Sequence, residues 1–130
     1  MRISIPFLPK PPMVAVVRLT GMISSGRGLS DQSAAPLIER AFRSKPQAVA
    51  LVINSPGGSP VQSSLIAARV RRLAQEKKLP VHVFVEDVAA SGGYWLACAG
   101  DQIWVDDSSI LGSIGVISSS FGFQDLMARH

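Results

Sequence analysis

The sequence predicts a single α/β domain built around a parallel sheet. Two short segments, residues 48–53 and 81–85, are almost continuously apolar, as strands covered on both faces of a sheet are. Stretches with helix-capping residues alternate with them, at a spacing that favours right-handed crossovers. A chain of 130 residues with 47% hydrophobic and 17% charged residues has the length and balance of one globular domain.

Five strands are expected. The first follows Pro12 and ends before Gly21, and its β-branched residues are typical of a buried strand. The predicted strands lie at residues 14–19, 48–53, 81–85, 102–105 and 114–117.

The first helix is predicted at residues 33–44. If Ser30 were its N-cap, Pro36 would lie inside the helix and break it. With Ser33 as the N-cap, Pro36 falls in the first turn, where its missing N–H costs nothing. We therefore expect the helix to begin after Ser33 and to stop before Pro46.

A second helix is predicted at residues 60–78. Ser59 is a suitable N-cap, Pro60 takes the first helical position, and Gln62 is placed to complete a capping box. Pro80 ends this segment. A short apolar helix is expected at residues 92–99, with Cys98 as a buried thiol.

Two glycine-containing turns follow the second and third strands: Asn-Ser-Pro-Gly-Gly at 54–58 and Ala-Ser-Gly-Gly-Tyr at 90–94. Sites in α/β sheets gather at these carboxyl ends. Ser91 opens a helix, so its hydroxyl and the N–H of Gly92 can face one point, while Gly57 and Gly58 offer further N–H groups. A hydroxyl nucleophile beside backbone donors is the arrangement needed for acyl transfer.

Together with Gly-Ser-Ile-Gly-Val at 112–116, these motifs resemble signal peptide peptidase A and its relatives, over roughly residues 14–117. The resemblance implies the Clp protease/crotonase-like fold, a superhelix of ββα units. It implies Ser91 as nucleophile, Gly57, Gly58 and Gly92 as oxyanion-hole donors, and a strand at Gly115 and Val116 that pairs with extended substrate.

The same resemblance implies a Ser-Lys dyad that hydrolyses peptides such as remnant signal peptides, or other membrane-associated or misfolded polypeptides. It also implies a homo-oligomer whose active sites are shared between subunits, with no cofactor. The four lysines, at positions 10, 45, 77 and 78, all precede Ser91. We therefore expect a C-terminally truncated single peptidase domain, inactive by itself, whose lysine base lies after residue 130.

Three alternative functions can be compared with this peptidase. A Ser-His-Asp triad fails because His82 lies inside a strand and His130 is terminal. A crotonase-type acyl-CoA enzyme would need acidic residues, of which Glu86 is nearest to the second turn. A non-catalytic scaffold of the same family is the third alternative.

Charge, residue pattern and hydropathy bear on three further properties: nucleic-acid binding, metal binding and localisation. The net charge of +4 includes a cluster of arginines and lysines at 69–78, but no aromatic residues interleave with it, so nucleic acid is not an expected partner. The aspartates at 101, 106 and 107 read as turn residues rather than metal ligands. Neither a signal peptide nor an apolar span is evident, so the sequence fits a bacterial cytoplasmic or membrane-associated protein and leaves the choice open.

Overall fold

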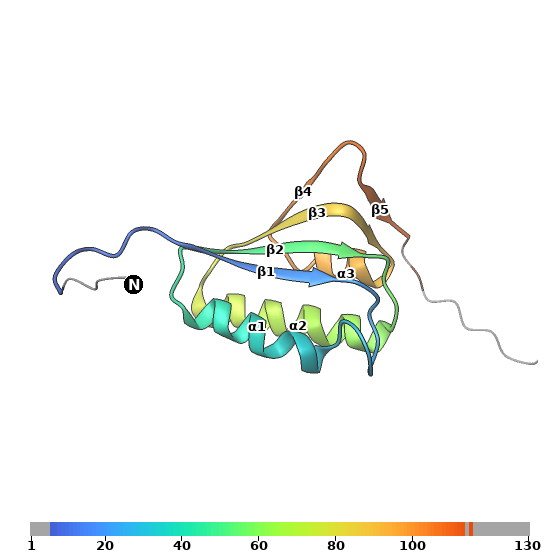
Figure 1. Ribbon diagram of the computed structural model, residues 1–130, viewed down its shortest axis with the longest axis horizontal. Helices are drawn as coiled ribbons and strands as arrows, with labels where there is room; N and C mark the ends of the chain where they lie inside the picture. Colours follow the sequence, from blue (N-terminus) through green and yellow to red (C-terminus); the bar gives the residue numbers. More distant parts are fainter. Residues whose placement is uncertain (1–5, 114, 116–130) are drawn as a thin grey trace, which may run out of the picture.

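The computed structural model describes residues 6–113 and residue 115. Its five strands form one parallel sheet in the order β1-β2-β3-β4, and β5 also pairs with β3 (Figure 1). The elements in chain order are β1 Val14–Thr20, α1 Asp31–Arg43, β2 Ala48–Ser55, α2 Pro60–Lys77, β3 Val81–Ala90, α3 Gly92–Ala97, β4 Gln102–Val105 and β5 Ile110–Gly112.

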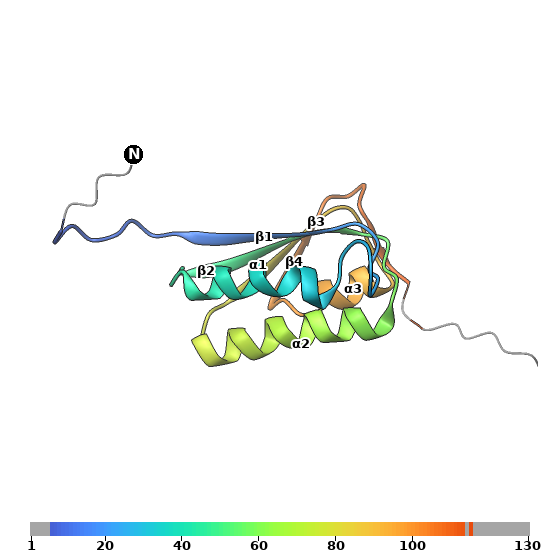
Figure 2. The same ribbon diagram turned by 60° about the horizontal axis from the view of Figure 1, so that its bottom comes forward.

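The described residues form two layers, because all three helices lie on the same face of the sheet (Figures 1 and 2). The helices α1 and α2 run side by side, and α3 lies beside the N-terminal half of α2. The core fills the space between the helices and the sheet. Its largest fully buried side chains are Phe42, Leu19, Ile23, Ile38, Leu51, Ile53, Ile66 and Leu96.

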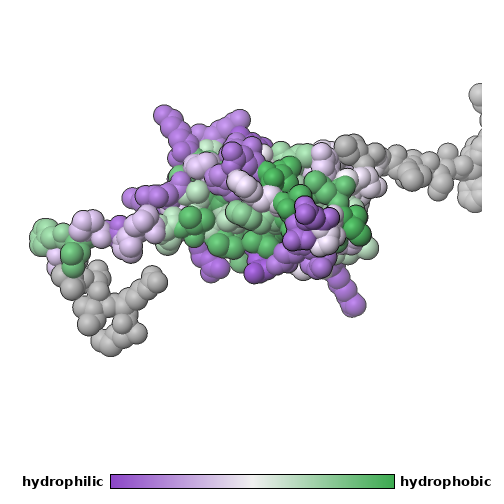
Figure 3. All heavy atoms as spheres, turned by 90° about the horizontal axis from the view of Figure 1, so that it is seen from above, coloured by the Kyte–Doolittle hydropathy of each residue, from purple (hydrophilic) through white to green (hydrophobic). Residues whose placement is uncertain are grey.

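The opposite face of the sheet is uncovered in the described residues and carries apolar side chains, including Val16, Phe84 and Trp104 (Figure 3). The rings of Phe84 and Trp104 stack at a centroid distance of 6.5 Å. Across this face, Arg18 and Glu86 form an exposed ion pair of 2.8 Å. None of the helices in residues 6–113 has the length and apolarity needed to cross a bilayer.

The prediction that the first helix begins after Ser33 was wrong. The helix begins at Asp31, Ser30 is the N-cap, and Pro36 lies inside the helix. Ser30 and Ser33 form a reciprocal capping box: the Ser30 hydroxyl accepts from Ser33 N at 3.1 Å, and Ser33 Oγ accepts from Ser30 N at 3.0 Å. Because Pro36 and Gln32 are both exposed, water can solvate the Gln32 carbonyl that loses its usual N–H partner.

The second helix begins at Pro60 as predicted, and the Ser59 hydroxyl accepts from Gln62 N at 3.3 Å. The predicted capping box is not completed. The Gln62 side chain accepts instead from the backbone N–H of Asp31, at 2.9 Å, and so joins the starts of the two helices. An ion pair of 2.8 Å between Arg69 and Asp31 joins the same helices.

Most predicted strands are present, and three of them run longer than expected. The third continues to Ala90, because its first half pairs with β4 and its second half with β5. The strand β5 at Ile110–Gly112 was not predicted. The predicted strand at 114–117 lies outside the described residues, except for Gly115.

Candidate active site

The two glycine turns lie against each other at the carboxyl ends of β2 and β3. A Cβ added to Gly57 would lie 2.7 Å from the Ala90 carbonyl oxygen and 2.8 Å from both Gly92 N and Ser91 Cβ. Such approaches leave no room for a side chain, and the φ of Gly57, 97°, also favours glycine. The structure therefore brings together the residues that the sequence singled out, although the two turns are separated by more than thirty positions.

Ser91 occupies the sharp junction between β3 and α3. Its backbone has φ 53° and ψ −118°, a conformation that residues with a side chain rarely adopt. The Ser91 N–H donates to the Gly112 carbonyl at 2.9 Å, and its own carbonyl accepts from Trp95 N at 3.1 Å. Its hydroxyl makes no capping bond to the helix. The backbone is thus fixed on both sides while the hydroxyl stays available.

Close packing explains the two glycines that follow Ser91. A Cβ on Gly92 would collide with the hydroxyl of Ser63 on α2, and a Cβ on Gly93 would collide with the carbonyl of Ser55 at the end of β2. The start of α3 is therefore wedged between α2 and β2. This packing sets the position of Ser91 relative to the first turn.

Two backbone N–H groups are available near Ser91. Within residues 6–113 and 115, the N–H groups of Gly58 and Gly92 have no hydrogen-bond acceptor. The N–H of Gly57, in contrast, donates to Ser55 Oγ at 3.1 Å, and that hydroxyl donates to the Gly21 carbonyl at 2.7 Å. Gly58 and Gly92 are therefore better placed than Gly57 to bind an anionic oxygen.

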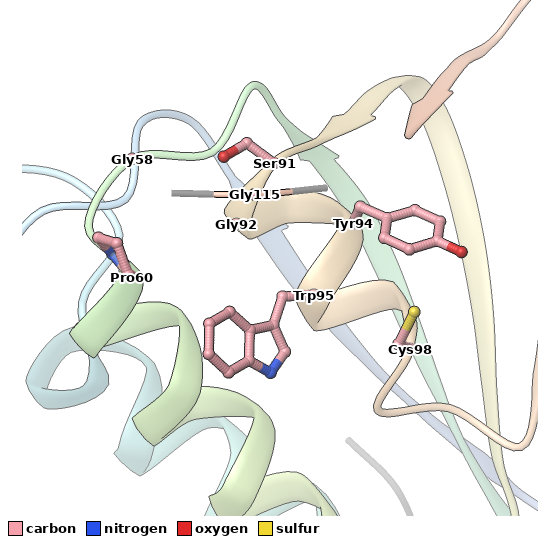
Figure 4. Close-up of a pocket in the computed structure, with 8 residues that line it drawn as sticks. All are labelled: Gly58, Pro60, Ser91, Gly92, Tyr94, Trp95, Cys98 and Gly115. Atoms are coloured by element: carbon pink, nitrogen blue, oxygen red, sulfur yellow. The ribbon is translucent and has the colours of Figure 1, made fainter. Parts of the chain in front are cut away.

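A cavity of about 300 Å³ opens beside Ser91 (Figure 4). Four of its lining residues occupy one face of α3 at positions i, i+3, i+4 and i+7, because the opposite face of this short helix is buried. The lining residues are Gly58, Pro60, Ser91, Gly92, Tyr94, Trp95, Cys98 and Gly115. The predicted strand residue Gly115 thus reaches this cavity, and Val116 lies outside the described residues.

The prediction that Cys98 is buried was wrong, because the thiol is exposed and lines the cavity. Cys98 follows Ser91 by seven positions and so lies on the same side of the helix as Ser91. The buried side of α3 is formed by Gly92, Gly93, Leu96 and Ala97, which explains why Cys98 is exposed. The neighbouring Cys98 thiol raises the pKa of the Tyr94 phenol. Tyr94 and Cys98 are the titratable side chains among the described residues that line this cavity.

None of the four lysines, all of which are described, lines the cavity. Pro60, at the first turn of α2, reaches it, whereas Lys77 ends the same helix about 26 Å away at 1.5 Å per residue. Lys45 precedes β2 and so lies at the other end of the strand from the glycine turn.

The other acid–base candidates lie elsewhere. His82 is half-buried near the start of β3, opposite Ala50 and Gln102 in neighbouring strands. Glu86 accepts from Arg18 on the uncovered face of the sheet. Neither residue lines the cavity, and His130 is outside the described residues.

Two of the three aspartates near β4, Asp101 and Asp106, have structural partners. Asp101 accepts from Val81 N at 2.7 Å, and Asp106 accepts from Ser108 N at 2.9 Å. The bonds from Ser108 lower the pKa of Asp106. No group of three potential metal-ligating side chains occurs in residues 6–113.

Sequence reasoning missed the walls of the cavity. The sequence indicated Pro60 only as a helix-starting residue and assigned no role to Trp95, yet both line the cavity. The helical spacing from Ser91 could have identified Tyr94, Trp95 and Cys98 as one face of a short helix. The approach of Pro60 could not be read in this way, because it depends on how α2 packs against α3.

Comparison with known proteins shows which family the chain resembles. Residues 73–130 match the model of peptidase family S49. Over 124 residues the chain is 36% identical to Protease 4 of Haemophilus influenzae, a match that covers 92% of this chain and 20% of that protein. By these two matches the chain is similar to peptidase family S49 and to a protease 4. Its resemblance to signal peptide peptidase A, inferred from the glycine motifs, is thereby confirmed.

Among other relatives of this chain, chloroplastic serine protease SPPA of Arabidopsis thaliana is 35% identical, covering 89% of the chain and 18% of that protein. A segment of the Na(+)/H(+) antiporter NhaA of Brucella melitensis is 56% identical over 122 residues, covering 89% of the chain and 17% of the antiporter. The chain therefore spans about a fifth of the length of these curated relatives.

Solved structures confirm the predicted fold of this chain. A serine-to-alanine mutant of the 1510-N membrane-bound stomatin-specific protease has a TM-score of 0.64 at 23% identity, covering 89% of this chain and 53% of that one. A ClpP1 mutant from Listeria monocytogenes has a TM-score of 0.53 at 17% identity, covering 66% of this chain and 46% of that one. The α/β sheet described above is thus of the Clp protease-like type.

Proposed function

We propose that the protein to which this chain belongs is a serine endopeptidase of the signal peptide peptidase A type, with Ser91 as its nucleophile. One observation carries the proposal: Ser91 is held at the start of α3 beside a cavity that Gly58 and Gly92, with their free N–H groups, also line. This arrangement supplies a nucleophile together with donors for a developing negative charge.

In the proposed reaction, Ser91 Oγ forms a bond to the scissile carbonyl carbon as its proton passes to a base. The carbonyl oxygen becomes an anion and accepts hydrogen bonds from the N–H groups of Gly92 and Gly58. Collapse of this intermediate breaks the C–N bond, and the leaving amine takes the proton. Water then hydrolyses the acyl-enzyme by the same steps and restores the Ser91 hydroxyl.

The base in this proposal is a lysine supplied from outside these 130 residues, by a later part of the protein or by a neighbouring subunit. The position of the four lysines supports it, because none lines the cavity. The greater length of the relatives leaves room for such a residue. One solved structure of the stomatin-specific protease is a lysine-to-alanine mutant in complex with a substrate peptide.

The substrates we propose are extended peptides, such as remnant signal peptides or other membrane-associated polypeptides. The apolar wall formed by Pro60 and Trp95 suits an apolar side chain of such a peptide. Gly115 lies at the same cavity, where the segment that it begins would pair with the peptide backbone. A homo-oligomer with shared sites is part of the same proposal.

The test compares Ser91→Ala with Ser25→Ala in the whole protein. Ser25 is exposed in the loop after β1 and makes a matched control for loss of one hydroxyl. Peptide hydrolysis should fall by at least about 10⁴-fold in Ser91→Ala and remain unchanged in Ser25→Ala, with equal thermal melts. Full activity in a folded Ser91→Ala protein would remove the nucleophile assignment.

A non-catalytic scaffold is the second candidate, favoured by the finding that no lysine or histidine of the described residues lines the cavity. A fluorophosphonate probe separates the two candidates, because it phosphonylates only an activated serine, with loss of fluoride. Labelling of wild type that disappears in Ser91→Ala supports the peptidase. A folded whole protein that neither hydrolyses peptides nor takes the label would be a scaffold.

A further inference from the structure

A second hollow continues the space beside Ser91 along the groove between α2 and α3. It has a volume of about 290 Å³, similar to the first cavity. On the α2 side its wall is made of small side chains spaced i, i+3 and i+4, namely Ser64, Ala67 and Ala68. Their small size leaves the groove open between the two helices.

The far end of this second hollow is closed by Arg71. Its guanidinium donates to the Ala99 carbonyl at 3.1 Å and forms an ion pair of 3.2 Å with Asp101. These contacts tie the C-terminal half of α2 to the segment after α3. The groove is therefore bounded by Arg71 at one end and opens beside Ser91 at the other.

Among the described residues, the two hollows share two lining residues, Trp95 and Cys98. Of these, Trp95 is the bulky one, and its indole extends from α3 into the space between α3 and α2 (Figure 4). Trp95 is 44% exposed as a residue, so neither hollow buries it fully. A single side chain thus stands between two spaces of nearly equal volume.

We propose that Trp95 sets the depth of the substrate groove, so that a peptide side chain entering beside Ser91 stops at the indole and does not reach the second hollow. This inference rests on the proposed peptidase function, because it assigns the side-chain specificity of the same site. Loss of the indole joins the two hollows and admits longer apolar side chains.

The experiment uses the whole protein and two fluorogenic peptides that differ only in the residue before the scissile bond, leucine in one and 2-naphthylalanine in the other. In Trp95→Ala the ratio of kcat/KM for the naphthyl peptide to that for the leucine peptide should rise about tenfold or more over wild type. Trp104→Ala is the matched control, since Trp104 is also exposed but lies in β4 and does not line either hollow. Its ratio should equal that of wild type.

A binding measurement tests the same proposal without Trp95→Ala, in case that variant does not fold. The leucine peptide is titrated into Ser91→Ala protein, which retains the groove, and tryptophan emission is recorded. The emission change should disappear when Trp95 is also replaced by phenylalanine, and it should persist when Trp104 is replaced instead.

The outcomes separate the two proposals. If wild type hydrolyses the leucine peptide but the ratio stays within about twofold in Trp95→Ala, the role of Trp95 is refuted. An emission change that persists without Trp95 refutes it as well. If wild type hydrolyses neither peptide and no probe labels Ser91, the peptidase function fails, and the emission titration still decides whether Trp95 faces a bound peptide.

Discussion

Gly92→Ala should destabilise the protein through one identifiable contact. The added Cβ would collide with Ser63 Oγ on α2 and lie 3.2 Å from Ile23 Cδ1. Overpacking of this kind costs about 1–3 kcal/mol. A glycine-to-alanine change also stabilises by about 0.4–1 kcal/mol through the unfolded chain, because the helical backbone at this position suits alanine. Overpacking prevails, and a net loss of about 1–2 kcal/mol follows.

Thermal unfolding followed by circular dichroism measures this loss. An unfolding entropy of about 2.1 cal/mol/K per residue gives about 270 cal/mol/K for a chain of this length, so each kcal/mol shifts Tm by about 4 °C. Gly92→Ala should therefore lower Tm by about 4–8 °C. Gly26→Ala is the control, since a Cβ there meets nothing within 4 Å, and its Tm should stay the same or rise slightly.

A double-mutant cycle with Ser63→Ala tests whether the hydroxyl is the cause. Without it, the new Cβ would still face Ile23 Cδ1 at 3.2 Å and Ser63 Cβ at 3.3 Å, and shifts of a few tenths of an ångström relieve both contacts. The cost of Gly92→Ala should then fall by at least about 1 kcal/mol, a coupling expected only of residues in contact. Equal losses of Tm in both backgrounds would refute the packing argument.

Two further predictions concern an ion pair and the thiol. The hydrogen bond from Arg69 lowers the pKa of Asp31, so the pair stabilises the fold above the unfolded-state pKa of about 3.9, and this contribution is lost as pH falls through the folded-state value. Asp31→Asn should therefore cost about 1 kcal/mol of stability at pH 7 and little at pH 2, whereas Glu76→Gln, in an exposed pair, should cost little at either pH. Urea titrations that show no pH-dependent difference between the two variants would contradict this. A maleimide should label Cys98 in the folded protein and leave Cys98→Ser unlabelled at that position, and labelling of Cys98 only after denaturation would show that the thiol is buried after all.

The sequence was most informative where a local pattern decides the structure. The apolar runs identified β1 to β4, and Ser59 with Pro60 identified the start of α2. The start of α1 was missed because a capping box between Ser30 and Ser33 outweighs the cost of Pro36 inside the helix. That balance depends on the magnitudes of two opposing effects, so the proline rule alone gave the wrong boundary.

Long-range packing accounts for the rest. That Gly57 fits against Ser91 follows from the pairing of β2 with β3, which brings the ends of the two strands together. The N–H of Gly57 is occupied by Ser55 Oγ, and no sequence rule separates it in this respect from the N–H of Gly58. The sequence could predict that the two glycine turns lie close together. It could not predict which of their N–H groups are hydrogen-bonded within the protein and which remain free for a ligand.

The backbone of Ser91 connects this packing to the proposed chemistry. Holding a residue with a side chain at φ 53° and ψ −118° costs about 1–3 kcal/mol and persists only where the surroundings enforce it. Here they do: Gly112 accepts the Ser91 N–H, and the Ser91 carbonyl accepts from Trp95 N. Gly57 closes the remaining side. A serine in relaxed helical geometry could use its hydroxyl to cap the helix that it begins, whereas the strained backbone of Ser91 keeps the hydroxyl free beside the cavity. The same constraint that destabilises this turn is therefore what keeps Ser91 available to a substrate.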